Sequence, residues 1–484
     1  MAGLRVTGAE PEPDGSLTVW AVPDAPARCP GCGAAPSGVH QHVVTGAKDV
    51  RCGGRRVRLR VHKRRLECGN RLCPVKTFTG PLPPLPPRCR ITPRLKDQVA
   101  SDVTDRGVTP AEAARHAGIA WHTAHDAFAV AADVILDVPL APVGHLGIDE
   151  HRRGKPRWRR DEETGQYELL ADRWHTCFSD LSGQQQMIGQ AQGRTAGDAA
   201  YWLAQAPPAW RDRIEIVCID MCTIYLPAVR RMLPQAQVAV DLFHVVHLAV
   251  NTVGDVRRRA TREKYGRRGR SGDPEYGIKN LLVRNLETLS TDQFTKIIDT
   301  LDADAQGQQV AVTWIAKEKL RDALNLRARV TGSAPCERQV RDRLFAFYDW
   351  CARHDDIPEL VSLAQTVSRW ERQIVCAVLT GVTNAGSESL NRLAKLEARL
   401  AYGFRNPASQ QRRVRIACTR ATRRNQPRTR AVTRKPDANR NQPTPRTRLT
   451  TKARLRAMLP PLLPHGMPSW VTVNPPDASA VSVC

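Results

Sequence analysis

The order of strand-like and helix-like segments between residues 144 and 250 constrains the fold more than any other feature. His145 to Asp149 is a short apolar strand, and two further strand-like segments, residues 174–178 and 186–189, flank a Ser-Gly turn. The chain then alternates helix and strand, with a helix over 195–206, a strand over 214–220, a helix over 224–233 and a strand over 237–241. This order predicts a mixed sheet with helices packed on its faces.

Two of these strands end in an aspartate, Asp149 and Asp220. The element order is that of an RNase H-like core, in which the two strands are neighbours, so both carboxylates are expected at one sheet edge. Facing carboxylates repel each other unless cations neutralise them, and hard oxygen ligands favour Mg²⁺ or Mn²⁺. Glu388, at the start of a helical pattern, is the candidate for a third acid. Three acids predict a site whose two ions clamp the attacking and leaving oxygens of a phosphodiester.

The same acids also have structural interpretations. A strand-end aspartate often caps the next helix, and Glu388 in a first turn complements the helix dipole. Glu150, Asp180 and Asp241 are rival ligands that spacing does not exclude. The residues alone therefore predict an acidic site without fixing its ligands.

A second metal site is predicted near the N-terminus by two close cysteine pairs. The four ligands are Cys29, Cys32, Cys68 and Cys73, and this spacing is typical of a tetrahedral structural Zn²⁺ site. Cys52 has no close-spaced partner and is expected to be a spare thiol.

The zinc module is expected to be β-rich and to bind DNA. Apolar and polar residues alternate over 4–22 and 57–61, as in half-buried strands. Basic residues crowd between the cysteine pairs, and the whole chain has a net charge of +25. Such an excess favours polyanionic partners and salt-sensitive association. Arg64 and Arg65 are predicted to contact DNA.

Two short helices follow, separated by a glycine. Thr109-Pro-Ala-Glu112 is a strong helix start, Gly118 ends that helix, and a second helix begins near Trp121. The pair resembles a helix-turn-helix, whose second helix enters a major groove, so Trp121, His122 and Thr123 are predicted to contact DNA. A plain helical hairpin is the alternative.

Composition divides the chain into successive parts. Pro81 to Pro87 is a semi-rigid connector, and the segment after Asn406 is rich in Arg, Thr, Pro and Asn without apolar periodicity. The predicted parts are a zinc-binding domain over 1–80, a proline-rich linker over 81–91, a helix-turn-helix domain over 92–140, an RNase H-like domain over 141–420 with a helical insertion at about 245–380, and a basic disordered tail over 421–484.

No segment predicts a membrane or secreted protein. No apolar run approaches the roughly 18 residues that span a bilayer, and residues 1–10 lack a signal-peptide pattern. The protein is therefore expected to be cytoplasmic and nucleoid-associated, without a membrane partner.

Taken together, several motifs resemble those of the ISL3 family of bacterial insertion-sequence transposases, over most of residues 1–425. The matching segments are the four paired cysteines, Gly147-Ile-Asp149-Glu150, Asp220, Asp241-Leu-Phe-His244, Thr383-Asn-Ala-Gly-Ser-Glu388-Ser-Leu-Asn391-Arg392 and Gly403-Phe-Arg-Asn406. Ser389 departs mildly from the family pattern, which usually has Gly or Ala after the Glu. The departure leaves the assignment of Glu388 in place.

The resemblance implies a DNA transposase with a DDE triad on an RNase H-like fold. The triad would be Asp149, Asp220 and Glu388, holding Mg²⁺ or Mn²⁺, with Asp241 and His244 supporting it. The implied activity is binding of terminal inverted repeats, followed by cleavage of double-stranded DNA and strand transfer into target DNA. Action on two ends favours a homodimer or a higher oligomer.

Two other classes of protein compete with this interpretation. One is a DNA-binding regulator or inactive transposase remnant that keeps the zinc and helix-turn-helix modules without catalysis. The other is a Mg²⁺-dependent nuclease without strand transfer. The three acids separate the first class from an enzyme, because a pure regulator does not need them.

Overall fold

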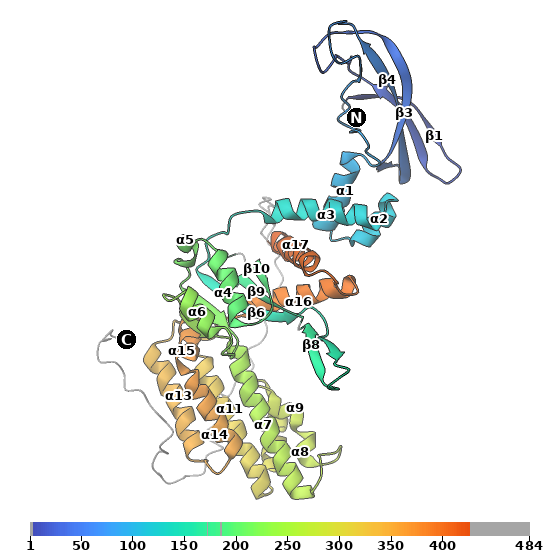
Figure 1. Ribbon diagram of the computed structural model, residues 1–484. Coiled ribbons are helices and arrows are strands. Elements are labelled where there is room, and N and C mark those ends of the chain that lie inside the picture. Colours follow the sequence, from blue (N-terminus) through green and yellow to red (C-terminus); the bar gives the residue numbers. More distant parts are fainter. Residues whose placement is uncertain (1–2, 172, 184–185, 426–484) are drawn as a thin grey trace, which may run out of the picture. The chain divides into compact units, whose positions relative to one another are not determined.

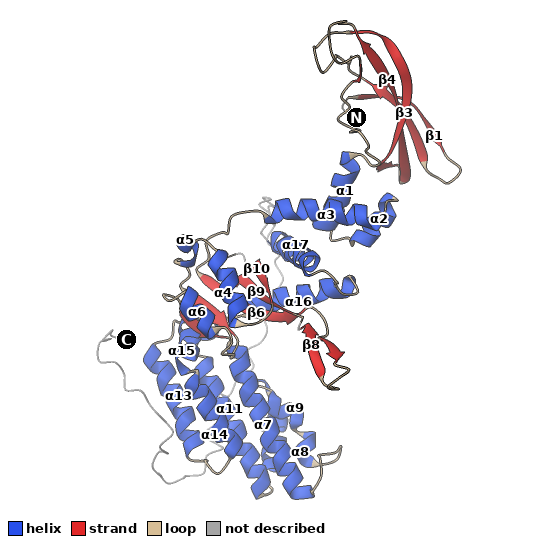
Figure 2. Ribbon diagram, in the orientation of Figure 1, coloured by secondary structure: helices blue, strands red, loops and turns tan. Residues whose placement is uncertain are grey.

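The computed structural model describes residues 3–171, 173–183 and 186–425, which form two compact units. One unit comprises residues 3–139 and 393–425, and the other comprises residues 140–392 with the gaps just given. Figure 1 labels the elements along the chain, and Figure 2 separates helices from strands. Among the described residues, no helix has both the length and the apolar character needed to cross a bilayer.

The first unit begins with an antiparallel-rich sheet in the order β1-β2-β4-β3, with β5 added to β4. Its strands are β1 (Leu4–Pro11), β2 (Leu17–Pro23), β3 (Pro36–Cys52), β4 (Arg55–Cys68) and β5 (Thr77–Thr79). The predicted β-rich module is confirmed. In β4 the side chains of Val57, Leu59 and Val61 are buried and the arginines between them are exposed. The alternation of apolar and polar residues in the sequence therefore reflects the two faces of this strand.

Three helices follow, α1 (Pro93–Thr104), α2 (Pro110–Ala117) and α3 (Trp121–Leu136). Thr109 caps α2 by accepting a hydrogen bond from the Glu112 N–H at 3.2 Å, as predicted. Gly118 ends α2 in the left-handed region at φ 64°, which a residue with a side chain rarely adopts. Phe128 of α3 is fully buried among α1 and α2 side chains.

The predicted disordered tail, 421–484, is wrong for its first five residues, because residues 421–425 are helical. Residues 407–425 form α17 (Pro407–Asn425), which packs with the helices of the first unit. Arg412 pairs with Asp133 of α3, with Nη2 3.1 Å from Oδ2. The sequence placed residues 407–420 in the catalytic domain and the tail from 421, so both bounds differ here. The rest of the predicted tail, 426–484, lies outside the described residues.

The second unit is built on a five-stranded sheet in the order β10-β9-β6-β11-β12. Its strands are β6 (His145–Arg152), β9 (Trp174–Asp180), β10 (Met187–Gln192), β11 (Ile216–Ile219) and β12 (Gln237–Val240). β6, β9 and β10 are antiparallel neighbours, whereas β11 is parallel to both β6 and β12. The five strands of this sheet follow one another along the chain in the predicted order.

Three helices connect these strands, α4 (Ala196–Gln205), α5 (Pro208–Arg211) and α6 (Leu226–Met232). Thr195 and Asp198 form a capping box that starts α4, since each side chain accepts a backbone N–H of the other residue. Ile148 and Phe178 of the sheet share a core with Leu203 of α4, and all three are fully buried.

The chain between β6 and β9 differs from the prediction. β6 continues past Asp149 to Arg152, so this acid lies inside a strand and not at its end. A separate two-stranded hairpin follows, β7 (Arg157–Arg160) and β8 (Tyr167–Ala171). The sequence did not predict the hairpin, because neither β7 nor β8 has the buried apolar face that gives an alternating pattern.

Residues 242–380 are helical, as their patterns predict. The elements are α7 (Leu242–Tyr265), α8 (Pro274–Gly277), α9 (Lys279–Val283), the 3₁₀ turn η1 (Leu286–Thr288), α10 (Thr291–Leu301), α11 (Ala305–Leu324), α12 (Ala328–Thr331), α13 (Glu337–Ala352), α14 (Pro358–Arg369) and α15 (Glu371–Thr380). α16 (Ala385–Leu400) then returns the chain to the sheet edge.

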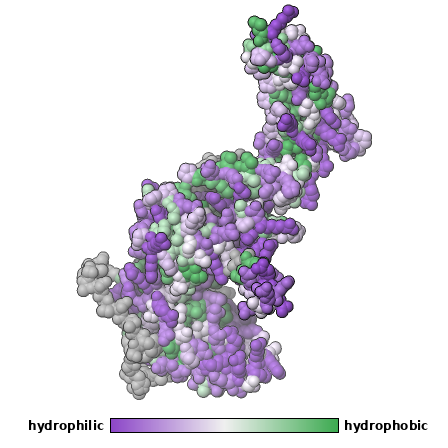
Figure 3. All heavy atoms as spheres, in the orientation of Figure 1, coloured by the Kyte–Doolittle hydropathy of each residue, from purple (hydrophilic) through white to green (hydrophobic). Residues whose placement is uncertain are grey.

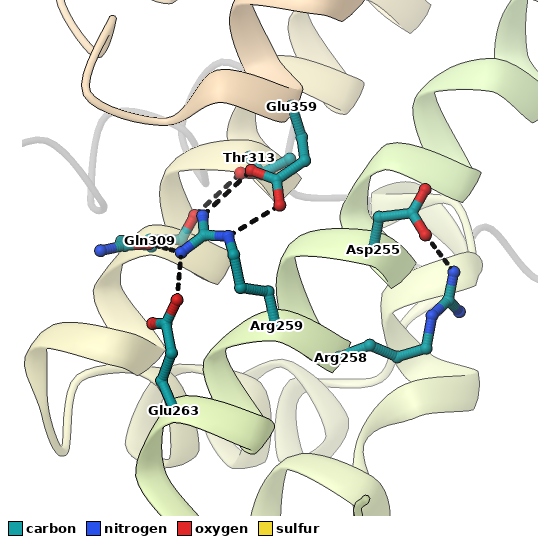
Figure 4. Close-up of polar contacts among 7 residues, drawn as sticks. All are labelled: Asp255, Arg258, Arg259, Glu263, Gln309, Thr313 and Glu359. Carbon is teal, nitrogen blue, oxygen red and sulfur yellow. Dashed lines mark hydrogen bonds and ion pairs between the residues drawn. The ribbon is translucent and has the colours of Figure 1, made fainter. Parts of the chain in front are cut away.

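A charged network ties three of these helices together. Arg259 of α7 donates to both Glu359 oxygens of α14 at 2.7 and 3.0 Å (Figure 4). The same guanidinium donates to Gln309 of α11 at 2.9 Å and to Glu263 at 3.0 Å. Bidentate pairing of this kind fixes orientation as well as distance, so the network sets how α7, α11 and α14 pack.

Candidate active site and metal centres

The carboxyl edge of the second sheet gathers the predicted acids. β11 pairs in parallel with β6, with Cys218 opposite Gly147, and each of these residues precedes its acid by two positions. Asp149 and Asp220 therefore reach the same edge. Asp241 follows β12 at that edge and caps α7, since its Oδ1 accepts a hydrogen bond from the Phe243 N–H at 3.3 Å.

Asp220, Asp241 and His244 form the tightest polar cluster at this edge. His244 Nε2 lies 3.3 Å from Asp220 Oδ2, and its Nδ1 lies 3.6 Å from Asp241 Oδ2. One potential ligand atom from each residue lies within 4.8 Å of the other two. The hydrogen bond to Asp241 and the negative charge of Asp220 raise the pKa of His244. A protonated His244 would thus partly neutralise the two carboxylates.

Asp149 is a partly buried carboxyl group beside this cluster. Burial, followed by the charge of Asp220, raises its pKa to about 7, although the Glu150 N–H and Asn391 donate to it. Asn391 Nδ2 lies 2.6 Å from Asp149 Oδ2. Burial also raises the pKa of Asp220, against the opposing effects of His244 and of Asn384 Nδ2 at 3.3 Å. Two partly buried carboxyl groups whose pKa values are both raised suit a divalent cation.

Glu388 lies in the first turn of α16 and is partly exposed. Its backbone N–H donates to the Asn384 carbonyl at 3.0 Å, and its charge adds to the forces that raise the pKa of His244. Glu388 is thus close enough to His244 for their charges to interact. Among the described residues, the group of mutually close ligand atoms at this edge contains neither Glu388 nor Asp149.

Two amide side chains, one just before α16 and one within it, are site residues that sequence reasoning did not single out. Asn384 and Asn391 are buried and each donates to one of the acids. Their Oδ1 atoms, like Ser387 Oγ, have no hydrogen-bond partner among the described residues. Buried unpartnered acceptors beside two acids fit a site that takes up cations or a polar substrate.

A glycine allows α16 to approach the sheet this closely. A Cβ on Gly147 would collide with Ser387 Oγ and lie 3.0 Å from Asn384 Oδ1. Gly147 belongs to the Gly-Ile-Asp motif noted in the sequence, and Asn384 belongs to the Thr-Asn-Ala motif. These two motifs were the sequence signal that could have identified the close packing and the amides.

The structure places two rival ligands away from this cluster. Glu150 lies on the opposite face of β6 from Asp149, where Tyr225 donates to its Oε2 at 3.0 Å. Asp180 lies in the β9–β10 turn, where its Oδ1 accepts hydrogen bonds from the backbone and side chain of Ser182 at 2.9 and 2.8 Å. The third rival, Asp241, lies within the cluster.

The cysteine quartet of the first unit has the geometry of a zinc site. Cys29 Sγ lies 3.8 Å from Cys73 Sγ, and Cys32 Sγ lies 3.5 Å from Cys68 Sγ. All four sulfurs lie within 4.8 Å of one another. Tetrahedral thiolates at a Zn–S distance of about 2.3 Å are about 3.8 Å apart, so the four residues fit this ion. Cys52 lies outside the cluster.

Four of the predicted DNA-contacting residues of the first unit are exposed, and Thr123 is partly buried. Arg64 lies on the outer face of β4, and Arg65, on its other side, donates to Thr77 Oγ1 at 2.9 Å. Trp121, His122 and Thr123 form the first turn of α3. The Trp121 ring is half-exposed and stacks on a histidine one turn later.

Three family models match consecutive parts of this chain. Residues 146–414 match a model described as transposase. Residues 25–73 match the zinc-finger of transposase IS204/IS1001/IS1096/IS1165, and residues 81–129 match the helix-turn-helix domain of transposase family ISL3. The zinc-finger match spans the first three ligands and ends at the fourth, Cys73.

Named relatives agree with these matches. The transposase for insertion sequence element IS1001 of Bordetella parapertussis is 26% identical over 404 residues, which cover 82% of this chain and 90% of the relative. The transposase for insertion sequence element IS1557 of Mycobacterium tuberculosis is 26% identical over 215 residues, covering 40% of this chain and 46% of the relative.

Proposed function

This chain belongs to the ISL3 family of transposases, and from that premise we propose how its residues cut and join DNA. The proposed enzyme binds the ends of its insertion sequence, cleaves them in a metal-dependent reaction and transfers the freed strand to target DNA. The observation that carries the proposal is the acidic sheet edge, where partial burial raises the pKa of both Asp149 and Asp220 and the charge of Asp220 raises that of Asp149 further.

We propose that the second unit is an RNase H-like core. Its sheet order β10-β9-β6-β11-β12, with an antiparallel hairpin on one side of β6 and parallel strands on the other, supports this assignment. In such a sheet, ligands bind outside the carboxyl ends of the parallel strands. The acids lie at that edge.

Asp149, Asp220 and Glu388 are proposed to hold Mg²⁺ or Mn²⁺. Bound there, two such ions would lower the pKa of the attacking water or hydroxyl and stabilise the leaving oxygen. Asn391 and Asn384 orient the two aspartates through the hydrogen bonds at 2.6 and 3.3 Å. Fixed carboxylates lose less entropy when a cation binds, so the amides raise metal affinity.

Asp241 and His244 are proposed to support the site. The Asp241 carboxylate, 3.6 Å from His244 Nδ1, helps keep His244 beside Asp220, and a protonated imidazole there limits repulsion between carboxylates before cations bind. His244 would then move away from Asp220 or lose its proton when the cations arrive, because like charges repel.

The first unit is proposed to recognise DNA. The Zn²⁺ ion would hold the cysteine module, Trp121, His122 and Thr123 would enter a major groove, and arginines such as Arg64 and Arg65 would contact phosphates. Cleavage at two element ends in one reaction requires at least two active sites, so the active form is proposed to be a dimer or a higher oligomer.

The regulator alternative is not favoured. Even partial burial of two neighbouring carboxyl groups costs free energy, and a protein that only binds DNA gains nothing from that cost. The transposase match spans the whole acidic site, from β6 through α16.

The proposal is tested by separating DNA binding from chemistry. Asp149→Asn, Asp220→Asn and Glu388→Gln are each expected to reduce Mg²⁺-dependent cleavage and joining of end DNA more than about a hundredfold, while DNA binding stays unchanged. Asp212→Asn is the matched control, since this exposed acid precedes β11 whereas Asp220 follows it. Full activity of the three variants, with equal binding, would show that the acids are assigned wrongly.

A further inference from the structure

The β7–β8 hairpin is an exposed arm at the acidic edge. It leaves the sheet at the carboxyl end of β6, the strand that carries Asp149, and returns to the start of β9. Figure 1 shows β8 standing away from the sheet of its own unit. All four β7 residues are exposed. An isolated two-stranded hairpin is marginal in water, so this arm is expected to be completed by a binding partner.

One face of the hairpin carries its aromatic side chains. Trp158 pairs with Leu169 across the strands, and Arg160 pairs with Tyr167, so these four side chains share a face. Trp158 is 55% exposed, Tyr167 69% and Leu169 42%. Such large exposed apolar groups, close together on a small arm, are typical of a binding surface.

The opposite face and the root of the hairpin are charged. Arg159 pairs with Glu168 at 2.6 Å on the face away from Trp158. At the root, burial and then the charges of Arg173 and Arg157 lower the pKa of Arg153. Positive charge is thus concentrated where the arm joins the sheet. In the space-filling view the arm presents mostly hydrophilic residues (Figure 3).

We propose that this hairpin binds unpaired nucleotides of the DNA beside the reacting phosphodiester. Trp158 and Tyr167 stack on bases, Arg160 lies against them, and the arginines of the root contact phosphates. Aromatic platforms next to cationic side chains are the general means of holding single-stranded nucleic acid. The inference rests on the proposed function only in taking DNA as the substrate at this sheet edge.

A second copy of this chain is the competing occupant of the aromatic face. A protein interface would bury Arg160 among apolar side chains, which is costly unless an acid accompanies it. Glu168 lies on the other face of this hairpin and is engaged by Arg159. The remaining acids, Asp161, Glu162 and Glu163, lie in the turn beyond Arg160, where Asp161 Oδ1 accepts the Glu163 and Thr164 N–H groups at 3.0 and 2.8 Å. DNA supplies both a stacking surface and negative charge, so it complements the face better.

The test compares two DNA probes without added Mg²⁺. Full-length protein is titrated onto a fluorescein-labelled duplex from the element terminus, and onto the same duplex with a short unpaired bulge, and anisotropy gives both affinities. Wild type is expected to prefer the bulged duplex. Trp158→Ala should lose about tenfold of that preference and keep its affinity for the paired duplex, whereas Trp158→Phe should keep most of the preference.

Tyr201→Ala is the matched control, because Tyr201 is an exposed aromatic residue on α4 of the same unit, outside the hairpin. Equal preference of wild type, Trp158→Ala and Tyr167→Ala for the bulged duplex would overturn the inference. So would sedimentation showing that Trp158→Ala converts an oligomer to monomers, since the arm would then bind a second copy. The assay involves no cleavage, so an error in the proposed acids would leave its result unchanged.

Discussion

At the scale of single residues, the site depends on amide side chains that hold its acids. Asn391→Leu removes the hydrogen bond to Asp149 and should therefore raise the pKa of this carboxyl group further. We expect cleavage to fall about 10- to 100-fold and to require a higher Mg²⁺ concentration. Initial cleavage rates across a Mg²⁺ titration measure both effects. Ser389→Ala, an exposed change on the same helix, is the control. An unchanged Mg²⁺ dependence in Asn391→Leu would contradict the assigned role.

Sequence reasoning could locate the acids but not the amides. Asp149 and Asp220 lie in or after apolar strands, so the strand pattern alone brings them to one edge. Asn384 immediately precedes α16 and Asn391 lies within it, where polar residues usually face water, and the packing of this segment on Gly147 buries them. The assignment of Glu388 as a ligand stays a prediction.

His175 should make stability depend on pH. Its ring is buried beside His151 and Arg153, and burial followed by these positive charges lowers its pKa to about 3. In the unfolded state this histidine has a pKa near 6.5, so below that pH it binds a proton that it does not bind in the folded state. The stability contribution is therefore complete above pH 6.5 and falls by about 1.4 kcal/mol per unit as pH decreases towards 3.

His175→Phe removes the titrating group and keeps a ring of similar size. Between pH 6.5 and pH 5 the variant should lose about 2 kcal/mol less stability than wild type. Urea denaturation at the two pH values measures the difference, and His116→Gln, at an exposed position of α2, is the control. Parallel losses in wild type and His175→Phe would contradict the assignment.

At the scale of elements, local capping decides where the helices of the first unit begin and end. Thr109→Ala leaves the Glu112 N–H without its cap and should destabilise the unit by about 1 kcal/mol, whereas Thr109→Ser should be nearly neutral. Thermal denaturation of the three proteins tests this. If Thr109→Ala unfolds at the same temperature as wild type, the cap contributes nothing to the stability of the unit.

Capping signals and alternating apolar patterns also explain which elements were predictable. α2, α4 and the five strands of the second sheet have clear signals. α17 has no such signal, because its buried face is narrow and most of its residues are arginine or polar. The composition of this segment is therefore similar to that of a disordered tail. The β7–β8 hairpin lacks a buried face altogether. Its partner, not its own packing, is expected to order it.

At the scale of the whole molecule, two metal sites of opposite ligand chemistry should separate binding from catalysis. Removing zinc with a chelator, or with Cys32→Ser, should abolish binding to end DNA, because structural Zn²⁺ contributes about 10 kcal/mol to the folding of comparable modules. Zinc content by atomic absorption and anisotropy with end DNA are the measurements. Cys52→Ser should change neither. End binding that survives the loss of zinc would disprove the structural role.

The central claim is that Asp220 binds the catalytic cation, and a change of ligand tests it most directly. Asp220→Cys replaces a hard oxygen by a soft sulfur, which binds Mn²⁺ better than Mg²⁺. We predict that cleavage and joining by this variant are lost with Mg²⁺ and partly restored with Mn²⁺, while end binding is the same with either ion. Wild-type activity of Asp220→Cys with Mg²⁺, or an equal loss with both ions, would contradict the claim.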